Sequence, residues 1–572
     1  MIKRVITGRL KALSGIYIGS GESGEATDKL IFRDSFGDIV IPGTAIAGAL
    51  RTLATRTAPN LGLKNCFAID RSDSDNVCAC PVCMMFGSFN PNDESENVKA
   101  SNIWVYDAVF MEKKITSIRD SVAIDRETGV SAREMRSKYD YEVLPRGSEF
   151  GFRIEIQDDL SSEQESLLVT VLSEWKNGRC YLGGNLSRGL GNMQLEDIEV
   201  HNLDLSKVGK LMDFLRKDDL IKVTEKDGKW LNECIENAKK SVKKINGLDG
   251  IYSSFAQIEI TLEFTGGFIL NDVMNANRSG FDFAPKMEDG KFLLPGSSLR
   301  GVLRSQAEKI VRSLVTFDVD NSNEFVERYP ACNPVANENA PLRSCNNILR
   351  FYIKENQIDT QKGINEDHFC LACRLFGSTY LGSRLFVSDG HLTGPKKIKI
   401  MDFLAIDRFT GGGKEGSKFN ALVLWQPSFK FRIFLENPKE WQLGWLMITL
   451  KDLHDGLLSV GSGQNKWFGK AMISDGELKI GVISEEFLPK GFVVNDYHEG
   501  IFKVGHLDLK DITMKPEENV EIWVKKFHSE LKNLKINIDI INIRNSSTCD
   551  TYFRDDIDMV ELYPKEVNIC AL

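Results

Sequence analysis

The sequence contains no run of about 18 uncharged apolar residues, the length that a membrane-spanning helix needs. Its first residues, MIKRVITGRL, also lack the apolar stretch of a secretory signal peptide. Neither membrane insertion nor secretion is indicated, and we expect a cytoplasmic protein. Low-complexity segments are absent as well, so the 572 residues should fold into about two to four globular domains.

The chain also lacks a net positive charge, since its formal net charge is −9 at pH 7. Free-standing proteins that bind nucleic acid without sequence preference usually have a basic surface, so this class is disfavoured. Any RNA binding must then depend on local groups of basic residues and on neighbouring proteins. Histidine is scarce too: only seven are present, and of these only His368 lies in a motif. Nothing supports a nuclease with a histidine base or a Ser-His-Asp hydrolase.

Cysteine, by contrast, is well represented, and most of the twelve residues are clustered. In a reducing compartment such clusters indicate metal ligands more often than disulfides. The first predicted zinc site is the Cys₄ set Cys66, Cys78, Cys80 and Cys83. The alternative for each cluster is a group of buried free thiols.

A second zinc site is predicted from His368, Cys370 and Cys373, with either Cys332 or Cys345 as the fourth ligand. We select Cys332 for this position. Because each set supplies four ligands, no coordination position is left open for a substrate, and both zinc ions would be structural.

Four sequence segments occur twice, in the same order and well over 200 residues apart. They are a Pro-Gly-(Thr/Ser) segment, a Cys-x-x-Cys-x-x-Phe-Gly-Ser segment, an Ile-Asp-Arg-x-Thr-Gly segment and a glycine loop. The first copies occupy residues 41–51, 78–88, 122–129 and 182–191, and the second copies occupy residues 294–304, 368–378, 404–411 and 460–469. This period is too long for a solenoid and indicates a duplicated domain.

Each copy starts with an alternating apolar pattern, at residues 2–13 and 257–264, that is typical of a half-buried strand. The Pro-Gly segment then predicts an amphipathic helix, with Thr44 and Ser297 as N-caps. This order predicts an α+β protein with two tandem ferredoxin-like (RRM-type) domains that carry long insertions. We place a first domain at 1–203, a helical linker at 204–250, a second domain at 251–484 and a C-terminal extension at 485–572.

The four segments resemble those of the RAMP superfamily, specifically the backbone subunits of type III CRISPR effector complexes of the Csm/Cmr type. They are matched in both halves, over about residues 1–200 and 255–480. The tandem form is similar to the fused backbone subunits of subtype III-D. The resemblance implies that the partners are a CRISPR guide RNA, a target RNA and other subunits of the effector complex. It also implies that β-hairpins at the Ile-Asp-Arg segments act as thumbs that splay nucleotides; ordinary surface hairpins are the alternative.

The glycine loops can bring backbone N–H groups and a cation close to phosphates, because glycine permits close approach. Plain turns are the alternative for the loops, and solvated charges are the alternative for the arginines. Together with the resemblance, these features predict the RNA-binding residues Arg51, Arg126, Gly184, Arg188, Gly189, Arg300, Arg304, Arg408, Gly461, Gly463 and Lys466.

The resemblance further implies a catalytic aspartate in the loop before the Pro-Gly segment. Asp28 has the family's spacing, since it stands fourteen residues before Pro42 and six before Asp34. Asp282 is the candidate in the second half, although it stands one residue nearer to its Pro-Gly segment, and Asp272 is the reserve. Such a carboxylate would bind Mg²⁺ or orient a ribose 2′-hydroxyl for attack on its neighbouring phosphate. An ordinary turn residue is the alternative.

The predicted function is therefore a guide-directed endoribonuclease subunit that cleaves paired target RNA and leaves a 2′,3′-cyclic phosphate. Two other functions stay open. One is a non-catalytic scaffold that only holds guide RNA, and the other is a nuclease that processes the guide precursor.

Overall fold

The computed structural model describes residues 2–24, 27–66, 78, 80–88, 100–112, 114–126, 128–132, 138–157, 159–216, 221, 224–243, 251–317, 330–335, 344–356, 364–509, 518–532 and 551–553. Part of the first predicted hairpin and much of the predicted C-terminal extension lie outside these ranges. Among the described helices, none combines the length and the apolar character that crossing a bilayer would require.

The first repeat is built on a six-stranded antiparallel sheet whose four main strands have the order β9-β1-β7-β3. The four strands are β1 (Ile2–Ala12), β3 (Ile103–Val105), β7 (Glu149–Ile156) and β9 (Asn192–Asp204). Alternate residues of β1, such as Ile6 and Leu10, are buried, as the period of two in the sequence predicts. They pack in one core with α1 (Gly43–Thr57) and α3 (Ser162–Lys176). The β-α-β-β-α-β order is that of a ferredoxin-like fold.

The second repeat has the same arrangement, with strand order β21-β11-β20-β16. Its strands are β11 (Ser254–Phe264), β16 (Leu385–Val387), β20 (Ser428–Glu436) and β21 (Ala471–Val482), and its helices are α7 (Gly296–Leu314) and α10 (Glu440–His454). The sheet is wider than the first. It gains β14 (Lys291–Leu294) and β17 (Gly390–Thr393) at one edge, and β22 (His498–Glu499) and β23 (Phe502–Asp508) at the other. The predicted α+β fold in two repeats is therefore confirmed.

The first helix of each repeat begins differently from the sequence prediction. Pro42 precedes α1, and no side chain within the segment caps that helix, while Ser297 lies inside α7. A distant carboxylate serves instead: Asp107 accepts the N–H of Gly43 at 2.7 Å, and Asp389 accepts the N–H of Gly296 at 2.9 Å. A carboxylate suits this place because the first N–H groups of a helix have no partner within it.

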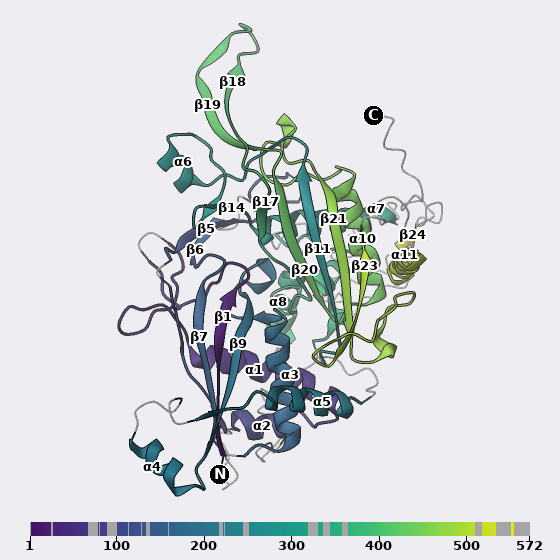
Figure 1. Ribbon diagram of the computed structural model, residues 1–572. Helices are drawn as coiled ribbons and strands as arrows, with labels where there is room; N and C mark the ends of the chain where they lie inside the picture. Colours follow the sequence, from purple (N-terminus) through teal and green to yellow (C-terminus); the bar gives the residue numbers. More distant parts are fainter. Residues whose placement is uncertain are drawn as a thin grey trace.

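Each repeat carries a β-hairpin at its Ile-Asp-Arg segment. The first hairpin pairs β5 (Ser117–Val122) with β6 (Lys138–Val143), and the second pairs β18 (Ile398–Ile406) with β19 (Gly413–Trp425). The second hairpin projects from the body of the protein (Figure 1). Its turn carries Phe409, which is 98% exposed.

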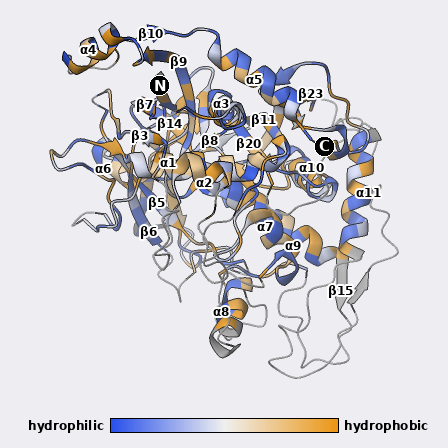
Figure 2. Ribbon diagram, turned by 90° about the horizontal axis from the view of Figure 1, so that it is seen from below, coloured by the Kyte–Doolittle hydropathy of each residue, from blue (hydrophilic) through white to orange (hydrophobic). Residues whose placement is uncertain are grey.

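The segments outside the two repeats attach to them. Between the repeats, α5 (Trp230–Ser241) packs on α3, whereas α4 (Val208–Arg216) lies at an edge of the molecule in both views (Figures 1 and 2). After the second repeat, α11 (Glu518–Lys532) packs on α10, with the rings of Phe527 and Trp445 stacked 5.5 Å apart. The predicted linker and C-terminal extension thus contribute to the cores of the neighbouring repeats.

The remaining described elements are short. They are β2 (Val40–Ile41), α2 (Pro81–Phe86), β4 (Ala108–Val109), β8 (Cys180–Tyr181), β10 (Glu225–Lys226), β12 (Gly267–Phe268), α6 (Val273–Ser279), β13 (Met287–Glu288), β15 (Val315–Phe317), α8 (Cys345–Asn356), α9 (Leu371–Phe376) and β24 (Thr551–Phe553).

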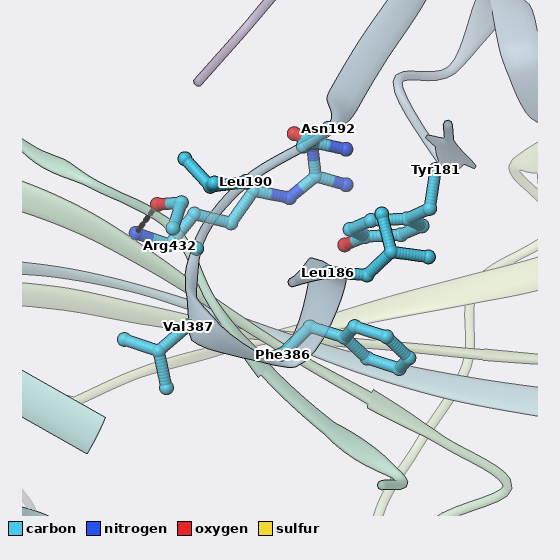
Figure 3. Close-up of a pocket in the computed structure, with 9 residues that line it drawn as sticks. Tyr181, Leu186, Leu190, Asn192, Phe386, Val387 and Arg432 are labelled. Carbon is cyan, nitrogen blue, oxygen red and sulfur yellow. Dashed lines mark hydrogen bonds between the residues drawn. The ribbon is translucent and has the colours of Figure 1, made fainter. Parts of the chain in front are cut away.

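The two repeats are packed against each other. The rings of Tyr181 and Phe386 lie 4.8 Å apart across the boundary, and Leu186 and Val387 both line a small cavity there (Figure 3). Phe255 from the second repeat belongs to the core cluster of the first repeat. The glycine loop of the first repeat thereby contacts β16 and α7 of the second.

Candidate functional site

The four cysteines predicted as the first zinc site lie together. The sulfur atoms of Cys66, Cys78, Cys80 and Cys83 are all within 4.8 Å of one another. Cys80 and Cys83 hold their places because Cys80 caps α2 and accepts the N–H of Cys83. Sulfur ligands of tetrahedral zinc stand about 3.8 Å apart, since each Zn–S bond is about 2.3 Å long. The set therefore has the composition and spacing of a Cys₄ zinc site.

The second cluster differs from the prediction in one ligand. It consists of Cys332, Cys345, Cys370 and Cys373, and His368 is not a member. His368 ends a short 3₁₀ helix, Glu366–His368, where its Nδ1 accepts the N–H of Asn365 at 3.0 Å. Both cysteines between which the sequence left a choice thus belong to the cluster, and the assignment of His368 as a ligand is corrected.

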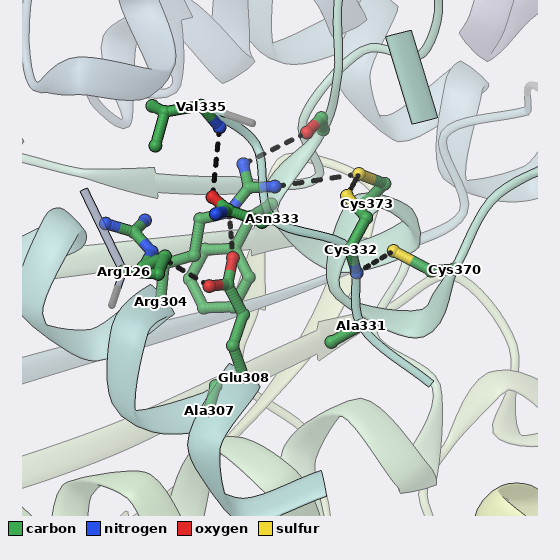
Figure 4. A network of polar contacts seen from close by, with 12 residues as sticks. Arg126, Arg304, Ala307, Glu308, Ala331, Cys332, Asn333, Val335, Cys370 and Cys373 are labelled. Atoms are coloured by element: carbon green, nitrogen blue, oxygen red, sulfur yellow. Dashed lines mark hydrogen bonds and ion pairs between the residues drawn. The ribbon is translucent and has the colours of Figure 1, made fainter. Parts of the chain in front are cut away.

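An arginine on the first helix of each repeat donates to a thiol of the neighbouring cluster. Arg51 Nη2 is 3.4 Å from Cys83 Sγ, and Arg304 Nη2 is 3.6 Å from Cys373 Sγ (Figure 4). The two arginines occupy equivalent positions, each eight residues after its Pro-Gly glycine. A cation at this place offsets the negative charge that thiolate ligands bring. Arg51 and Arg304, predicted at phosphates, are thus directed towards sulfur.

The thiols of the clusters have strongly perturbed pKa values. Burial alone would raise the pKa of the Cys370 thiol, but hydrogen bonds from the other three thiols bring it well below its usual value. In the first cluster, burial raises the pKa of Cys80 to about 11, whereas hydrogen bonds to its neighbours lower the pKa of Cys78. In each cluster the hydrogen bonds thus lower the pKa of one thiol, which favours its thiolate form, the form that binds a metal.

The two candidate catalytic aspartates occupy equivalent places. Asp28 donates its backbone N–H to Asp140 Oδ1 at 2.8 Å, and its own Oδ2 accepts the backbone N–H of Asp140 at 3.0 Å. Asp282 makes the same two contacts with Asn420, at 2.9 and 2.8 Å. Both aspartates are exposed at the base of a hairpin. Asp282 is one residue nearer to its Pro-Gly segment than Asp28 is, and the loop between them accommodates this difference without changing the contacts of the aspartate.

The reserve candidate, Asp272, has a structural place. It is buried, it caps α6 by accepting the N–H groups of Met274 and Asn275, and it forms an ion pair with Lys286 at 3.2 Å. Its carboxylate is therefore committed to folding contacts, and Asp282 is the residue that matches Asp28.

Each glycine loop places one cation over an aromatic ring of the hairpin in the same repeat. The Arg188 guanidinium lies 5.7 Å from the ring centre of Tyr139, and Lys466 Nζ lies 5.7 Å from that of Phe419. Tyr139 directly precedes Asp140, and Phe419 directly precedes Asn420. In each repeat the loop cation thus lies over the aromatic residue that directly precedes the partner of the candidate aspartate.

Glycine is required in these loops because they pass close to other backbone. At Gly183 a Cβ atom would stand 2.2 Å from the carbonyl oxygen of Tyr17, and at Gly461 it would stand 2.6 Å from that of Ile269. Gly463 adopts a φ of +83°, which favours glycine, and Gly184 lies beside the Tyr17 ring. The two glycine loops therefore pack closely against the backbone at Tyr17 and at Ile269.

The remaining predicted arginines lie at two places. Arg126 reaches from the first hairpin to Glu308 on α7, with a distance of 2.9 Å, and Glu308 also pairs with Arg304 at 2.8 Å (Figure 4). Burial, together with the nearby charges of Arg304 and Arg188, lowers the pKa of Arg300 to about 9. Arg408 is exposed in the turn of the second hairpin. Arg126 and Arg304 thus share one carboxylate where the two repeats meet, whereas Arg408 lies apart from them on the second hairpin.

Sequence reasoning did not single out Asp140, Asn420, Tyr139 or Phe419. A signal was present, because residues 138–140 read Lys-Tyr-Asp and residues 418–420 read Lys-Phe-Asn, at matching places in the two hairpins. The match is only three residues long and only its lysine is identical, so it becomes clear only from the equivalent contacts that β6 and β19 make with the two aspartates.

Comparisons with known proteins agree with the duplication. The family model of the RAMP superfamily matches twice, at residues 9–194 and 282–474, which together make up more than half of the chain. A protein of Methanocaldococcus jannaschii named "CRISPR system Cms endoribonuclease Csm3" is 26% identical over 35% of this chain and 80% of its own length. A protein of the same name from Methanothermobacter thermautotrophicus is 25% identical over 34% of this chain and 84% of its own length. Each relative is thus similar to about one repeat.

Proposed function

The chain belongs to the RAMP superfamily, and from this premise we propose that it is a backbone subunit of a type III CRISPR ribonucleoprotein. In this role it binds guide RNA, associates with other subunits of the complex and cleaves the complementary target RNA. The proposal is carried by the double match to the family, together with the same reciprocal hydrogen bonds at Asp28 and Asp282 in the two repeats. Similarity to two proteins named as Csm3 endoribonucleases supports cleavage as the activity.

Guide and target RNA would bind along the side that holds the glycine loops and hairpins. Arg188, Lys466 and Arg408 are exposed there, and aromatic rings beside the first two offer stacking surfaces for bases. Burial and the charges of Arg304 and Arg188 lower the pKa of Arg300, and a phosphate beside it would supply a counter-charge. Base pairing would select the target, while the protein contacts backbone and shape. The hairpins would act as the thumbs that splay target nucleotides.

Cleavage would use Asp28 and Asp282. In each residue one carboxylate oxygen is held by a backbone N–H, and the other accepts no hydrogen bond from the described residues. That second oxygen would orient the ribose 2′-hydroxyl and receive its proton while the 2′-oxygen attacks the adjacent phosphorus. The bond from phosphorus to the 5′-oxygen of the next nucleotide would break and this oxygen would take a proton from water, leaving a 2′,3′-cyclic phosphate and a 5′-hydroxyl. A divalent cation such as Mg²⁺ at the carboxylate would stabilise the charge on the phosphate.

The cysteine clusters would hold two structural zinc ions. The ligands are Cys66, Cys78, Cys80 and Cys83 in the first repeat, and Cys332, Cys345, Cys370 and Cys373 in the second. The first cluster lies beside α1 and the second beside α7. Each zinc ion would therefore stabilise the position of the helix that follows the catalytic loop.

The assembled complex with guide RNA and an end-labelled target tests this function. Asp28→Ala should remove one cleavage position and leave the others, Asp282→Ala should remove a different one, and the double variant should lack both. Target affinity should stay within about twofold, because an aspartate contributes nothing to phosphate neutralisation. An unchanged product ladder in the double variant would assign this chain the scaffold role. Cleavage of precursor RNA but not of target would assign it guide processing.

A further inference from the structure

The two candidate sites hold their aspartates by the same pair of hydrogen bonds but with different partners. Asp140 supplies a carboxylate oxygen to the backbone of Asp28, whereas Asn420 supplies an amide oxygen to the backbone of Asp282. The return contacts, from the backbone N–H of residues 140 and 420 to the aspartate carboxylates, measure 3.0 and 2.8 Å. The side-chain oxygen is therefore the feature that the two partners share.

The surroundings of the two partners match closely. Asp120 lies opposite Asp140 across the first hairpin and pairs with Lys138 at 3.7 Å. Asp402 lies opposite Asn420 and pairs with Lys418, also at 3.7 Å. An aromatic residue precedes each partner in the chain. Both hairpins thus have the same aspartate–lysine pair beside the partner residue. They differ at the partner itself, which is charged at position 140 and neutral at position 420.

The reciprocal contact joins two parts of each repeat that are far apart in sequence. Asp28 and Asp282 belong to loops before the Pro-Gly segment, while their partners belong to hairpin strands, 112 and 138 residues away. A loop aspartate without such an anchor would sample several orientations. With the backbone N–H and one carboxylate oxygen both held, the second oxygen has a defined direction relative to the hairpin.

We propose that Asp140 and Asn420 are positioning residues for Asp28 and Asp282, and that each acts as a hydrogen-bond acceptor rather than as a charge. This inference rests on the proposed function, since it assigns a role in the same cleavage reaction. The second repeat already shows the acceptor without the charge. Asparagine at position 140 should therefore work, and a side chain without an acceptor should not.

The test measures single-turnover cleavage of a labelled target at saturating guide complex, with each cleavage position scored separately. Asp140→Ala should slow cleavage at the position that Asp28→Ala removes by about 10- to 100-fold, because misplacement of a catalytic group has effects of this size. Asp140→Asn should cleave within about threefold of the wild type. Asn420→Ala and Asn420→Asp should give the corresponding pair of results at the other position.

Each variant contains its own control, because the untouched repeat should cleave at the normal rate. Asp120→Ala is the matched variant: it removes a carboxylate from the same hairpin without touching Asp28, and its cleavage should be normal. Target affinity and zinc content, measured in parallel, exclude a folding defect. The inference is overturned if Asp140→Ala cleaves normally, or if Asp140→Asn is as slow as Asp140→Ala, which would mean that the charge is required. Failure of the proposed function is a separate result, namely an unchanged ladder when Asp28 and Asp282 are replaced.

Discussion

The guanidinium of Arg119 in the first hairpin lies 2.8 Å from the carboxylate of Asp389 in the second repeat, and both side chains are buried. The two residues are 270 positions apart in sequence. Arg119 also pairs with Glu288, and Asp389 also accepts the N–H groups of Gly15 and Gly296. Asp389 thus both caps α7 and joins the repeats. In the first repeat, the corresponding Asp107 also caps its helix but is exposed.

Replacing Arg119 by methionine, the residue that stands at the matching place in the second hairpin (Met401), should destabilise the protein by about 3–5 kcal/mol. The reason is that Asp389 and Glu288 would stay buried without a counter-charge. Chemical denaturation followed by tryptophan fluorescence measures the change. Arg9→Met, which removes ion pairs that are partly exposed to solvent, should cost less than about 1 kcal/mol. Equal effects of the two substitutions would contradict the importance of the buried pair.

Gly189→Trp should destabilise the contact between the repeats by about 2–4 kcal/mol. A Cβ at Gly189 would stand 2.7 Å from the carbonyl oxygen of Val387 and 3.0 Å from Gly296 Cα, and its φ of +97° disfavours other residues. The matching position in the second loop is Trp467, which is 83% exposed at a φ of +62°. Trp467→Gly is therefore the reciprocal control and should leave thermal stability unchanged or slightly higher. Tolerance of tryptophan at position 189 would show that the repeats can separate there.

Zinc analysis separates the two ligand sets for the second cluster. The protein purified under reducing conditions should contain about two zinc ions per chain, because each cluster supplies four thiols. Cys345→Ser should lower this to about one, and His368→Gln should leave it at two. The reverse pattern would restore His368 as the ligand. Absence of zinc from the folded wild-type protein would remove the metal assignment altogether.

His391 on β17 should make the protein less stable in weak acid. Burial, with the charges of Arg146 and Lys430, lowers its pKa from 6.5 to about 4. Because the folded state resists protonation, the stabilising effect of neutral His391 is complete above pH 6.5 and is lost as the pH falls towards 4. After allowance for partial solvent screening, this loss is about 1 kcal/mol between pH 7 and 5. His391→Gln should therefore show a flatter dependence of melting temperature on pH, and parallel curves for the two proteins would count against this role.

The architecture could be predicted because its signals are local or repeat in order. Apolar and polar residues alternate along β1 and β11. This pattern predicts a strand with one buried face, because successive side chains of a strand point to opposite sides. The Cys-x-x-Cys segments place two thiols around the first turn of α2 and α9, which short-range geometry alone brings together. The duplication followed from four segments in the same order, and it required no knowledge of their contacts.

Contacts between distant segments could not be predicted in this way. Arg51 and Arg304 are ordinary helix arginines in the sequence, and only the fold directs them to Cys83 and Cys373. The N-caps predicted at Thr44 and Ser297 were wrong because a carboxylate from a connection between two distant strands takes that role. A local sequence pattern does not determine which distant residue will form the hydrogen bond or ion pair.

The sequence by itself determined that this protein has two ferredoxin-like repeats, each with a cysteine cluster, a glycine loop and an aspartate before the Pro-Gly segment. The tertiary structure brought both Cys332 and Cys345 into the second cluster in place of His368, and it paired Asp28 with Asp140 and Asp282 with Asn420. The physical reason is distance along the chain. Periodicity and short spacing act over a few residues, whereas the loop and hairpin of each site are joined only when the intervening sheet and helices have packed.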